Sequence, residues 1–179
     1  MKSRYKFYDI EGALYFVTDT IVENIPTFIN EKYFNILIDN LKFYQTNQGL
    51  KIYFYVIMDS HMHMIVSHPS DISKVIRNFK SYTATRIIKQ LERDKRNDVL
   101  TWLEDYKKKY KKQSKHQVWQ EGSHPQLIQS LEMLKQKVDY IHFNPVKRGF
   151  VEEPEEWRYS SIMNTLNMDS VLDIIEIEF

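Results

Sequence analysis

The sequence contains no cysteine among its 179 residues, which excludes disulfide bonds, thiolate chemistry and zinc sites built from cysteine. Glycine is also scarce, with 4 residues, so the chain is neither loop-rich nor supplied with a glycine-rich loop for nucleotide phosphates. Because no run of about 18 apolar residues occurs, we expect no transmembrane helix and no membrane partner. The basic N-terminus is not followed by the apolar segment of a signal peptide, so the expected location is cytoplasmic.

Hydrophobic residues make up 42% of the chain, with 12 tyrosines and 10 phenylalanines, which is enough for one well-packed core. We therefore expect a single domain over residues 1–179, with a basic helical excursion at about 88–116 and an acidic tail at about 152–179. Residues 74–116 contain 14 Lys and Arg against 5 Asp and Glu, although the whole chain has a net charge of only +1. This basic middle favours a polyanionic partner, with an ordinary solvated helix face as the alternative.

The hydrophobic pattern alternates between strand and helix periods and indicates an α+β protein. N-cap residues and turn residues divide the chain into β-α-β-β-α-β followed by one more helix. This order predicts a ferredoxin-like antiparallel sheet with helices on one face and an additional C-terminal helix. The expected strands are 13–18, 51–58, 61–67 and 117–120, and the expected helices begin after Asn30, Asp71 and Ser130, with a further helical piece at about 99–112.

Two histidines lie two residues apart on the third expected strand. Side chains at positions i and i+2 of a strand point to the same face, so His61 and His63 present two imidazoles side by side. Met62 and Met64 then point to the opposite face. Two nitrogen ligands on one strand are half of a metal site, and the remaining ligand and a nucleophile must come from elsewhere in the chain.

The last expected helix offers both missing groups. Tyr140 and Asn144 are four residues apart and so share one helix face. The tyrosine has a hydroxyl that can act as a nucleophile, and the asparagine has an amide oxygen that suits a hard metal ion. Pro145 follows directly and is expected to end the helix.

Four motifs lie between Val56 and Ser161. They are Val56-Ile57-Met58-Asp59-Ser60-His61-Met62-His63, Trp119-Gln120, Tyr140-Ile141-His142-Phe143-Asn144-Pro145-Val146-Lys147-Arg148-Gly149 and Trp157-Arg158-Tyr159-Ser160-Ser161. The histidine motif resembles that of HUH endonucleases, and its flanks resemble the single-tyrosine transposases. The segment from Trp119 to Ser161, which contains the other three motifs, is similar to the branch known as REP-associated tyrosine transposases. The resemblance as a whole covers most of the chain, from Tyr15 to Ser161.

This resemblance implies a domain that cuts and rejoins single-stranded or hairpin DNA. By the same analogy Tyr140 is the nucleophile and forms a 5′-phosphotyrosine, with His61 and His63 completing the catalytic set. A divalent metal, Mg2+ or Mn2+, would be held by His61, His63 and Asn144, and no nucleotide cofactor is implied because the phosphotyrosine conserves the bond energy. Insertion-sequence relatives act as dimers, so a homodimer is a further possibility.

The chain departs from the family pattern at two places. The insertion-sequence branch uses a glutamine as the third metal ligand, where this chain has the shorter Asn144. The residues before the histidines are usually Pro-Asn, whereas here they are Asp59 and Ser60.

Cationic and aromatic residues outside this cluster are candidates for DNA contact, chiefly to phosphates. Each of these residues also has a role without DNA. The cations within helices can belong to an ordinary solvated helix face, and the cations after Asn144 can complement the helix dipole. The tryptophan can pack in the core. Tyr82, on the basic helix, is a competing nucleophile. The candidate DNA-binding residues are Lys74, Arg77, Lys80, Arg86, Trp119, Lys147 and Arg148.

Two other function classes stay open at this point. The first is a catalytically silent nucleic-acid-binding module, which would expose aromatic residues on the sheet. The second is a histidine-ligated metallohydrolase that uses water in place of Tyr140.

Overall fold

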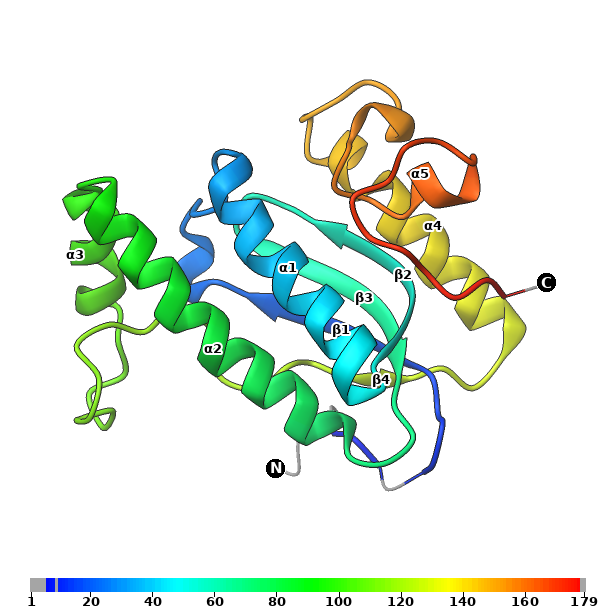
Figure 1. Ribbon diagram of the computed structural model, residues 1–179, viewed down its shortest axis with the longest axis horizontal. Helices are drawn as coiled ribbons and strands as arrows, with labels where there is room; N and C mark the ends of the chain where they lie inside the picture. The colour runs from blue at the N-terminus through cyan, green and yellow to red at the C-terminus, as the bar shows by residue number, and fades with distance from the viewer. Residues whose placement is uncertain (1–5, 9, 178–179) are drawn as a thin grey trace.

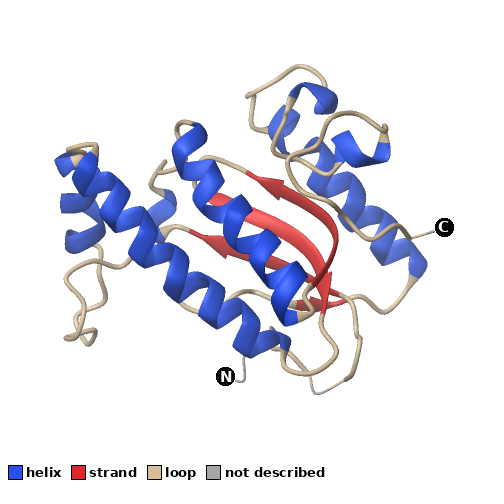
Figure 2. Cartoon of the chain, in the orientation of Figure 1, coloured by secondary structure: helices blue, strands red, loops and turns tan. Residues whose placement is uncertain are grey.

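The fold is built on a four-stranded antiparallel sheet with the strand order β2-β3-β1-β4, which confirms the expected ferredoxin-like topology (Figures 1 and 2). The structure is a computed structural model, and it describes residues 6–8 and 10–177. None of the helices in these residues combines the length and the hydropathy needed to cross a bilayer. The elements are β1 Tyr15–Thr20, α1 Glu31–Gln48, β2 Lys51–Ile57, β3 His61–Ser67, α2 Ile72–Arg93, α3 Asn97–Asp105, β4 Gln126–Leu127, α4 Leu131–Lys147 and α5 Ile162–Thr165, with short 3-10 turns at Val22–Asn24 and Pro154–Glu156.

Both faces of the sheet are covered. Helices α1 and α2 lie over one face, and α4 lies over the other (Figure 1). The larger core forms under α1 and α2, while a smaller apolar cluster joins α4 to the sheet. Because β3 is a central strand between these layers, all seven of its residues are buried. The N-caps predicted at Asn30, Asp71 and Ser130 are confirmed, since each side chain accepts a backbone N–H from the first turn of its helix.

The fourth strand is not where the sequence pattern predicted it. Residues 117–120 make only an isolated bridge between Trp119 and Ile21, and β4 lies later in the chain. Both residues 117–120 and β4 run antiparallel to the β1 side of the sheet, and the N–H of Gln120 donates to the carbonyl of Thr20 at 2.8 Å. Gly122, with φ of +74°, turns the chain between these two pairings, so regular strand geometry resumes only after Pro125.

Two helix ends also differ from expectation. The helix predicted at about 99–112 ends at Asp105, and the lysine-rich stretch after it forms turns. Pro145 does not stop α4, because it lies inside the last turn and the helix continues to Lys147. Proline's fixed φ is compatible with a helix, and near the C-terminus only one backbone hydrogen bond is lost. Asn144 therefore keeps helical geometry relative to Tyr140.

The outer edge of β2 is covered by the C-terminal part of the chain. Ile57 donates its N–H to the carbonyl of Tyr159, and Ser161 donates its N–H to the carbonyl of Tyr55, each at 2.9 Å. Farther along the same edge, the N–H of Ile175 donates to the carbonyl of Ile52 at 2.8 Å. Since an uncovered edge strand can pair with another chain, these bonds close β2 to edge-to-edge association.

A buried ion pair connects β1 to α2 and to the loop before β4. The carboxylate of Asp19 is fully buried and lies 3.1 Å from Lys80 Nζ. The same ammonium donates to the carbonyls of Gln120 and Gly122. Ser123 Oγ donates to Asp19 Oδ1 at 2.5 Å. Burial raises the pKa of Asp19 even though Lys80 lowers it, so the carboxylate depends strongly on this partner.

Replacing Lys80 with alanine should destabilise the fold by about 3–5 kcal/mol, because the substitution leaves a buried carboxylate without its counter-charge. Urea unfolding followed by circular dichroism measures the change. Lys74→Ala, on the exposed side of the same helix, is the matched control and should stay within about 0.5 kcal/mol of the parent protein. A loss below about 1 kcal/mol for Lys80→Ala would show that the pair contributes little beyond an ordinary hydrogen bond.

Candidate active site

The histidine pair faces α4, as the strand alternation predicted. His61 and His63 point to the smaller cluster, whereas Met62 and Met64 are fully buried in the core under α1 and α2. The two imidazole centroids are 4.9 Å apart, and the side chains are only 7% and 4% exposed. The pair therefore sits in a nearly closed site rather than on a solvent face.

Helix α4 brings Tyr140 against this pair. Leu134 and Ile141 pack on the sheet within the smaller cluster and hold the helix in place. The Tyr140 ring lies edge-on to His63, with 5.0 Å between centroids. Tyr140 is nevertheless 38% exposed, so it lies at the border between the buried cluster and solvent.

Both histidines are oriented by hydroxyl groups. Thr18, which pairs with His63 across β1 and β3, places its Oγ1 2.8 Å from His63 Nδ1. Ser60 Oγ donates to Asp59 Oδ1 at 3.0 Å and lies 3.4 Å from His61 Nδ1. A hydroxyl that donates its only proton to a carboxylate must accept from the imidazole, so this contact favours the proton on Nδ1 of His61. With the proton of His63 also on Nδ1, the Nε2 atoms of His61 and His63 each carry a lone pair.

Asn144 completes the cluster from one helical turn beyond Tyr140. Its side chain lies close enough to His61 to raise the pKa of that imidazole, and it is 5% exposed. Among the described residues, Asn144 Oδ1 and His63 Nε2 are buried atoms without a hydrogen bond of standard geometry. No cluster of three histidine, cysteine or acidic side chains occurs in that same part of the chain, so a metal at this pair requires a ligand of another type.

The imidazoles at this site are held neutral by their surroundings. Burial lowers the pKa of His63 to about 3, and the nearby cations Lys137 and Arg148 add to the effect. Burial also lowers the pKa of His61, again with a contribution from Arg148. Neutral imidazole is the form that binds metal ions.

The predicted DNA-binding residues do not form one surface. Lys147 and Arg148 are exposed at the end of α4, and Lys147 Nζ lies 5.7 Å from the centroid of the Tyr140 ring. Lys74, Arg77 and Arg86 are exposed on α2, which covers the opposite face of the sheet. The competing nucleophile Tyr82 lies on α2 as well, where its hydroxyl accepts a hydrogen bond from Arg86 at 3.1 Å.

Two of the predicted DNA contacts belong to the protein interior. Trp119 is 5% exposed, packs in the core against Phe28 and Phe79, and donates its indole N–H to Thr83 Oγ1 at 3.1 Å. Its ring is therefore not open for a base to stack on, which corrects the expectation. The charge of Lys80 is paired with Asp19, so this lysine acts as a structural clamp rather than as an exposed phosphate contact.

Three residues near the pair were not singled out from the sequence. Thr18 contacts His63, Phe16 stacks on the His63 ring at 5.5 Å, and Lys137 Nζ lies 4.6 Å from the Phe16 centroid. Phe16 and Thr18 share one face of β1, but nothing in the sequence indicates that this face pairs with the histidines. Only the β1–β3 register supplies that information.

Comparison with known proteins identifies the family of the chain. A sequence profile of IS200-like transposases matches residues 26–144. A Haemophilus influenzae protein assigned as a REP-associated tyrosine transposase is 27% identical over 160 residues, which span 89% of this chain and 85% of that protein. A REP-associated tyrosine transposase solved bound to a REP hairpin has a similar fold, with a TM-score of 0.69 and 20% identity over 99% of this chain and 94% of the other.

The matched region runs from the loop before α1 to Asn144 and so includes both histidines and the tyrosine. The profile covers more than half of the chain. The chain belongs to the IS200-like transposase family.

Proposed function

We propose that the chain cuts and rejoins single-stranded DNA through Tyr140, with a divalent metal bound by His61, His63 and Asn144. The observation that carries this proposal is the contact between Tyr140 and His63, whose ring centroids are 5.0 Å apart although the residues are far apart in sequence. A hydroxyl nucleophile beside two neutral imidazoles and an amide oxygen is the set of groups that metal-assisted phosphoryl transfer by a tyrosine requires.

The residues present fit a divalent ion. Among the described residues, His63 Nε2 and Asn144 Oδ1 are buried and make no hydrogen bond of standard geometry, and leaving a buried polar group unsatisfied costs about 1–3 kcal/mol. The hydroxyls of Thr18 and Ser60 engage the other ring nitrogen of each histidine, as the outer partners of metal-bound histidines commonly do. When bound, the ion would polarise the scissile phosphate and stabilise the charge that develops on it. The imidazole nitrogens favour Mn2+ and the amide oxygen favours Mg2+, so both ions are candidates.

The protein groups divide the reaction between them. Tyr140 Oη attacks the phosphorus, a new O–P bond forms to the 5′ phosphate, and the P–O3′ bond breaks. The phenol proton passes to solvent, and the departing 3′ oxygen takes up a proton to become a hydroxyl. Lys147 and Arg148, which are exposed at the end of the same helix, would contact the negatively charged DNA backbone. Attack by a 3′-hydroxyl on the phosphotyrosine reverses the step and reseals a strand.

Hairpin DNA is the proposed substrate class. The REP-associated transposase of similar fold was solved bound to a REP hairpin, which supports a hairpin or repeat element here. A homodimer and a cytoplasmic location also stay predictions. A dimer cannot form by pairing of β2, since residues 159–161 and Ile175 already occupy that edge.

The alternative of a silent binding module is less well supported. Such a module reads nucleic acid with aromatic residues on an open sheet face. Here α1 and α2 cover one face and α4 covers the other (Figure 1). Aromatic residues on the sheet, such as Phe16 and Phe54, are buried beneath α4.

Tyr140→Phe should abolish formation of a covalent protein–DNA adduct, because the substitution removes only the attacking oxygen. The measurement is a denaturing gel after incubation with hairpin-bearing single-stranded DNA and Mn2+ or Mg2+. Tyr82→Phe is the matched control and should retain the adduct, because Tyr82 lies on the other face of the sheet. Strand cleavage that persists in Tyr140→Phe would assign the chemistry to water and contradict the proposal.

Thr18→Val should weaken Mn2+ binding by about 10–100-fold, because it removes the hydroxyl that orients His63 while keeping the shape of the side chain. Titration calorimetry with Mn2+ in the absence of DNA measures this effect independently of activity. Thr18→Ser restores the hydroxyl and should bind within about threefold of the parent protein. Equal affinities for the valine and serine variants would rule out an orienting role for Thr18.

Asn144→Leu should reduce Mn2+ affinity by a similar factor, because leucine fills the same buried space without an oxygen. Asn144→Gln introduces the residue used by the insertion-sequence relatives and should retain measurable binding. If Asn144→Leu binds Mn2+ as tightly as the parent protein does, the third ligand is not Asn144.

A further inference from the structure

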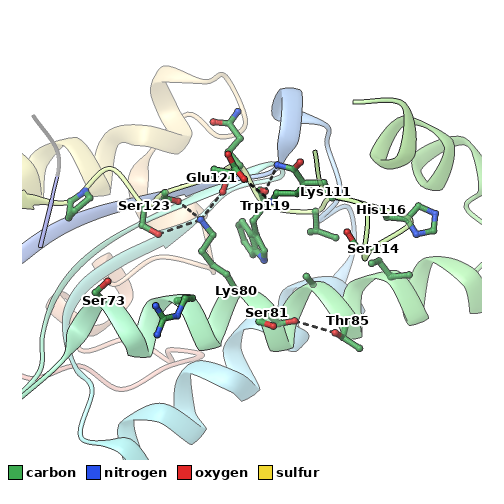
Figure 3. Close-up of a pocket in the computed structure, with 18 of the residues that line it drawn as sticks. Ser73, Lys80, Ser81, Thr85, Lys111, Ser114, His116, Trp119, Glu121 and Ser123 are labelled. Atoms are coloured by element: carbon green, nitrogen blue, oxygen red, sulfur yellow. Dashed lines mark hydrogen bonds and ion pairs between the residues drawn. The ribbon is translucent and has the colours of Figure 1, made fainter. Parts of the chain in front are cut away.

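A groove lies between α2 and the segment 111–125, away from the cluster around Tyr140 (Figure 3). Its volume is about 910 Å3, which falls in the range of pockets that bind small organic ligands. None of the residues that line it contributes to the histidine cluster. The proposed chemistry therefore leaves this groove without a role.

One wall of the groove is a polar stripe along α2. Ser73, Arg77, Ser81 and Thr85 recur every four residues, so they share one helix face. Figure 3 shows Ser81 and Thr85 on this wall, with Ser114 and other polar side chains on the facing segment. Hydroxyl groups and arginine are donors that recur in contacts to phosphate and sugar oxygens.

The charge of the groove is positive. Four cationic side chains line it, against the single carboxylate of Glu121. Two of them are paired, because Lys80 contacts Asp19 and Lys111 Nζ lies 3.2 Å from Glu121 Oε1. Arg77 forms no ion pair within the described residues, so its guanidinium remains available for a bidentate contact to phosphate.

Part of the groove lining is apolar. It includes Val118 and Trp119, which are buried, and Ala84 and Ile88 on α2, which are partly exposed. A site with apolar, cationic and hydroxyl-bearing lining matches an unpaired nucleotide, whose base is apolar on its faces and whose phosphate is anionic. In a duplex the base faces are stacked on one another, so they cannot contact the apolar lining.

The groove is also preformed. Lys80 donates to the carbonyls of Gln120 and Gly122 from beneath, and thereby fixes the loop that forms the second wall (Figure 3). A wall held by buried bonds loses little entropy when a ligand binds.

We propose that this groove binds a short unpaired stretch of nucleic acid, as a second contact site on the α2 side of the sheet. This inference rests on the proposed function, because the ligand proposed for the groove belongs to the same class as the proposed substrate, single-stranded nucleic acid. Arg77 holds a backbone phosphate, and a base lies against the partly exposed Ala84 and Ile88 of α2.

The absence of cysteine allows a direct test, because one introduced cysteine is the only thiol in the protein. Ser81→Cys places a thiol in the groove, and Asn78→Cys places one on the exposed side of α2 as the matched control. Both are made in the Tyr140→Phe background without metal, so no cleavage occurs. The rate of maleimide labelling is measured with and without an oligothymidylate of about 15 nucleotides, a typical length for single-strand binders.

Saturating oligothymidylate should slow labelling of Ser81→Cys on the order of tenfold, with a change below about twofold for Asn78→Cys. An equal concentration of duplex should protect neither position. Unchanged labelling of Ser81→Cys, with oligonucleotide binding seen by fluorescence anisotropy, would place the bound strand elsewhere and overturn the proposal. Equal protection by duplex would overturn the assignment to unpaired nucleic acid.

A second measurement separates the groove from protein charge in general. Arg77→Glu should weaken oligothymidylate binding by about tenfold or more, since a charged hydrogen bond is replaced by repulsion. Lys42→Glu makes the same charge change on α1, outside the groove, and should alter binding by less than about threefold. Equal losses in both variants would show a nonspecific charge effect and overturn the proposal.

These results are independent of the chemistry at Tyr140. If the groove proposal fails, the parent protein still forms the covalent adduct. If the proposed function fails, no adduct forms, yet Ser81→Cys is still protected by oligothymidylate.

Discussion

The packing of α4 on the sheet is the contact on which the candidate site depends. β3 is buried on both faces, so alternate residues of one strand serve two separate environments. Met62 and Met64 contribute to the core under α1 and α2, while His61 and His63 remain on the face that α4 covers. A shift of α4 by one residue would turn the tyrosine away by about 100°. The apolar contacts that hold α4 are therefore as important to the site as the tyrosine itself.

The site differs from an ordinary protein core in the hydrogen bonding of its buried polar atoms. Buried atoms on His63 and Asn144 lack partners among the described residues, although buried polar groups are nearly always paired in folded proteins. Their neighbours are well satisfied, because Thr18 and the Asp59–Ser60 pair engage the other nitrogens of the two imidazoles. This arrangement also gives a structural role to Asp59 and Ser60, the two residues that depart from the usual family motif. The hydroxyl contacts orient the imidazoles before any ion binds. The buried atoms without partners lower the stability of the fold, and a bound ion would offset this cost.

The elements that were predicted well are those with strong local signals. Apolar runs of strand-like composition, separated by the turn signal at Asp59 and Ser60, located β2 and β3, and polar N-caps located the starts of α1, α2 and α4. The errors occurred where local signals are weak or depend on distant partners. Residues 117–120 have strand-like composition, but Gly122 interrupts their pairing with β1. Pro145 was expected to end α4, yet a proline in the last turn costs little and the helix continues.

By itself, the sequence determined that two imidazoles share a strand face and that Tyr140 and Asn144 share a helix face, because both periods are local properties of the backbone. Only the tertiary structure decided that these two faces meet, since their contact depends on the strand register and on the packing of α4. It also decided which cations are available. Lys80 became a buried clamp and Trp119 a core residue, because the ion pair and the apolar contacts that hold them come from segments distant in sequence.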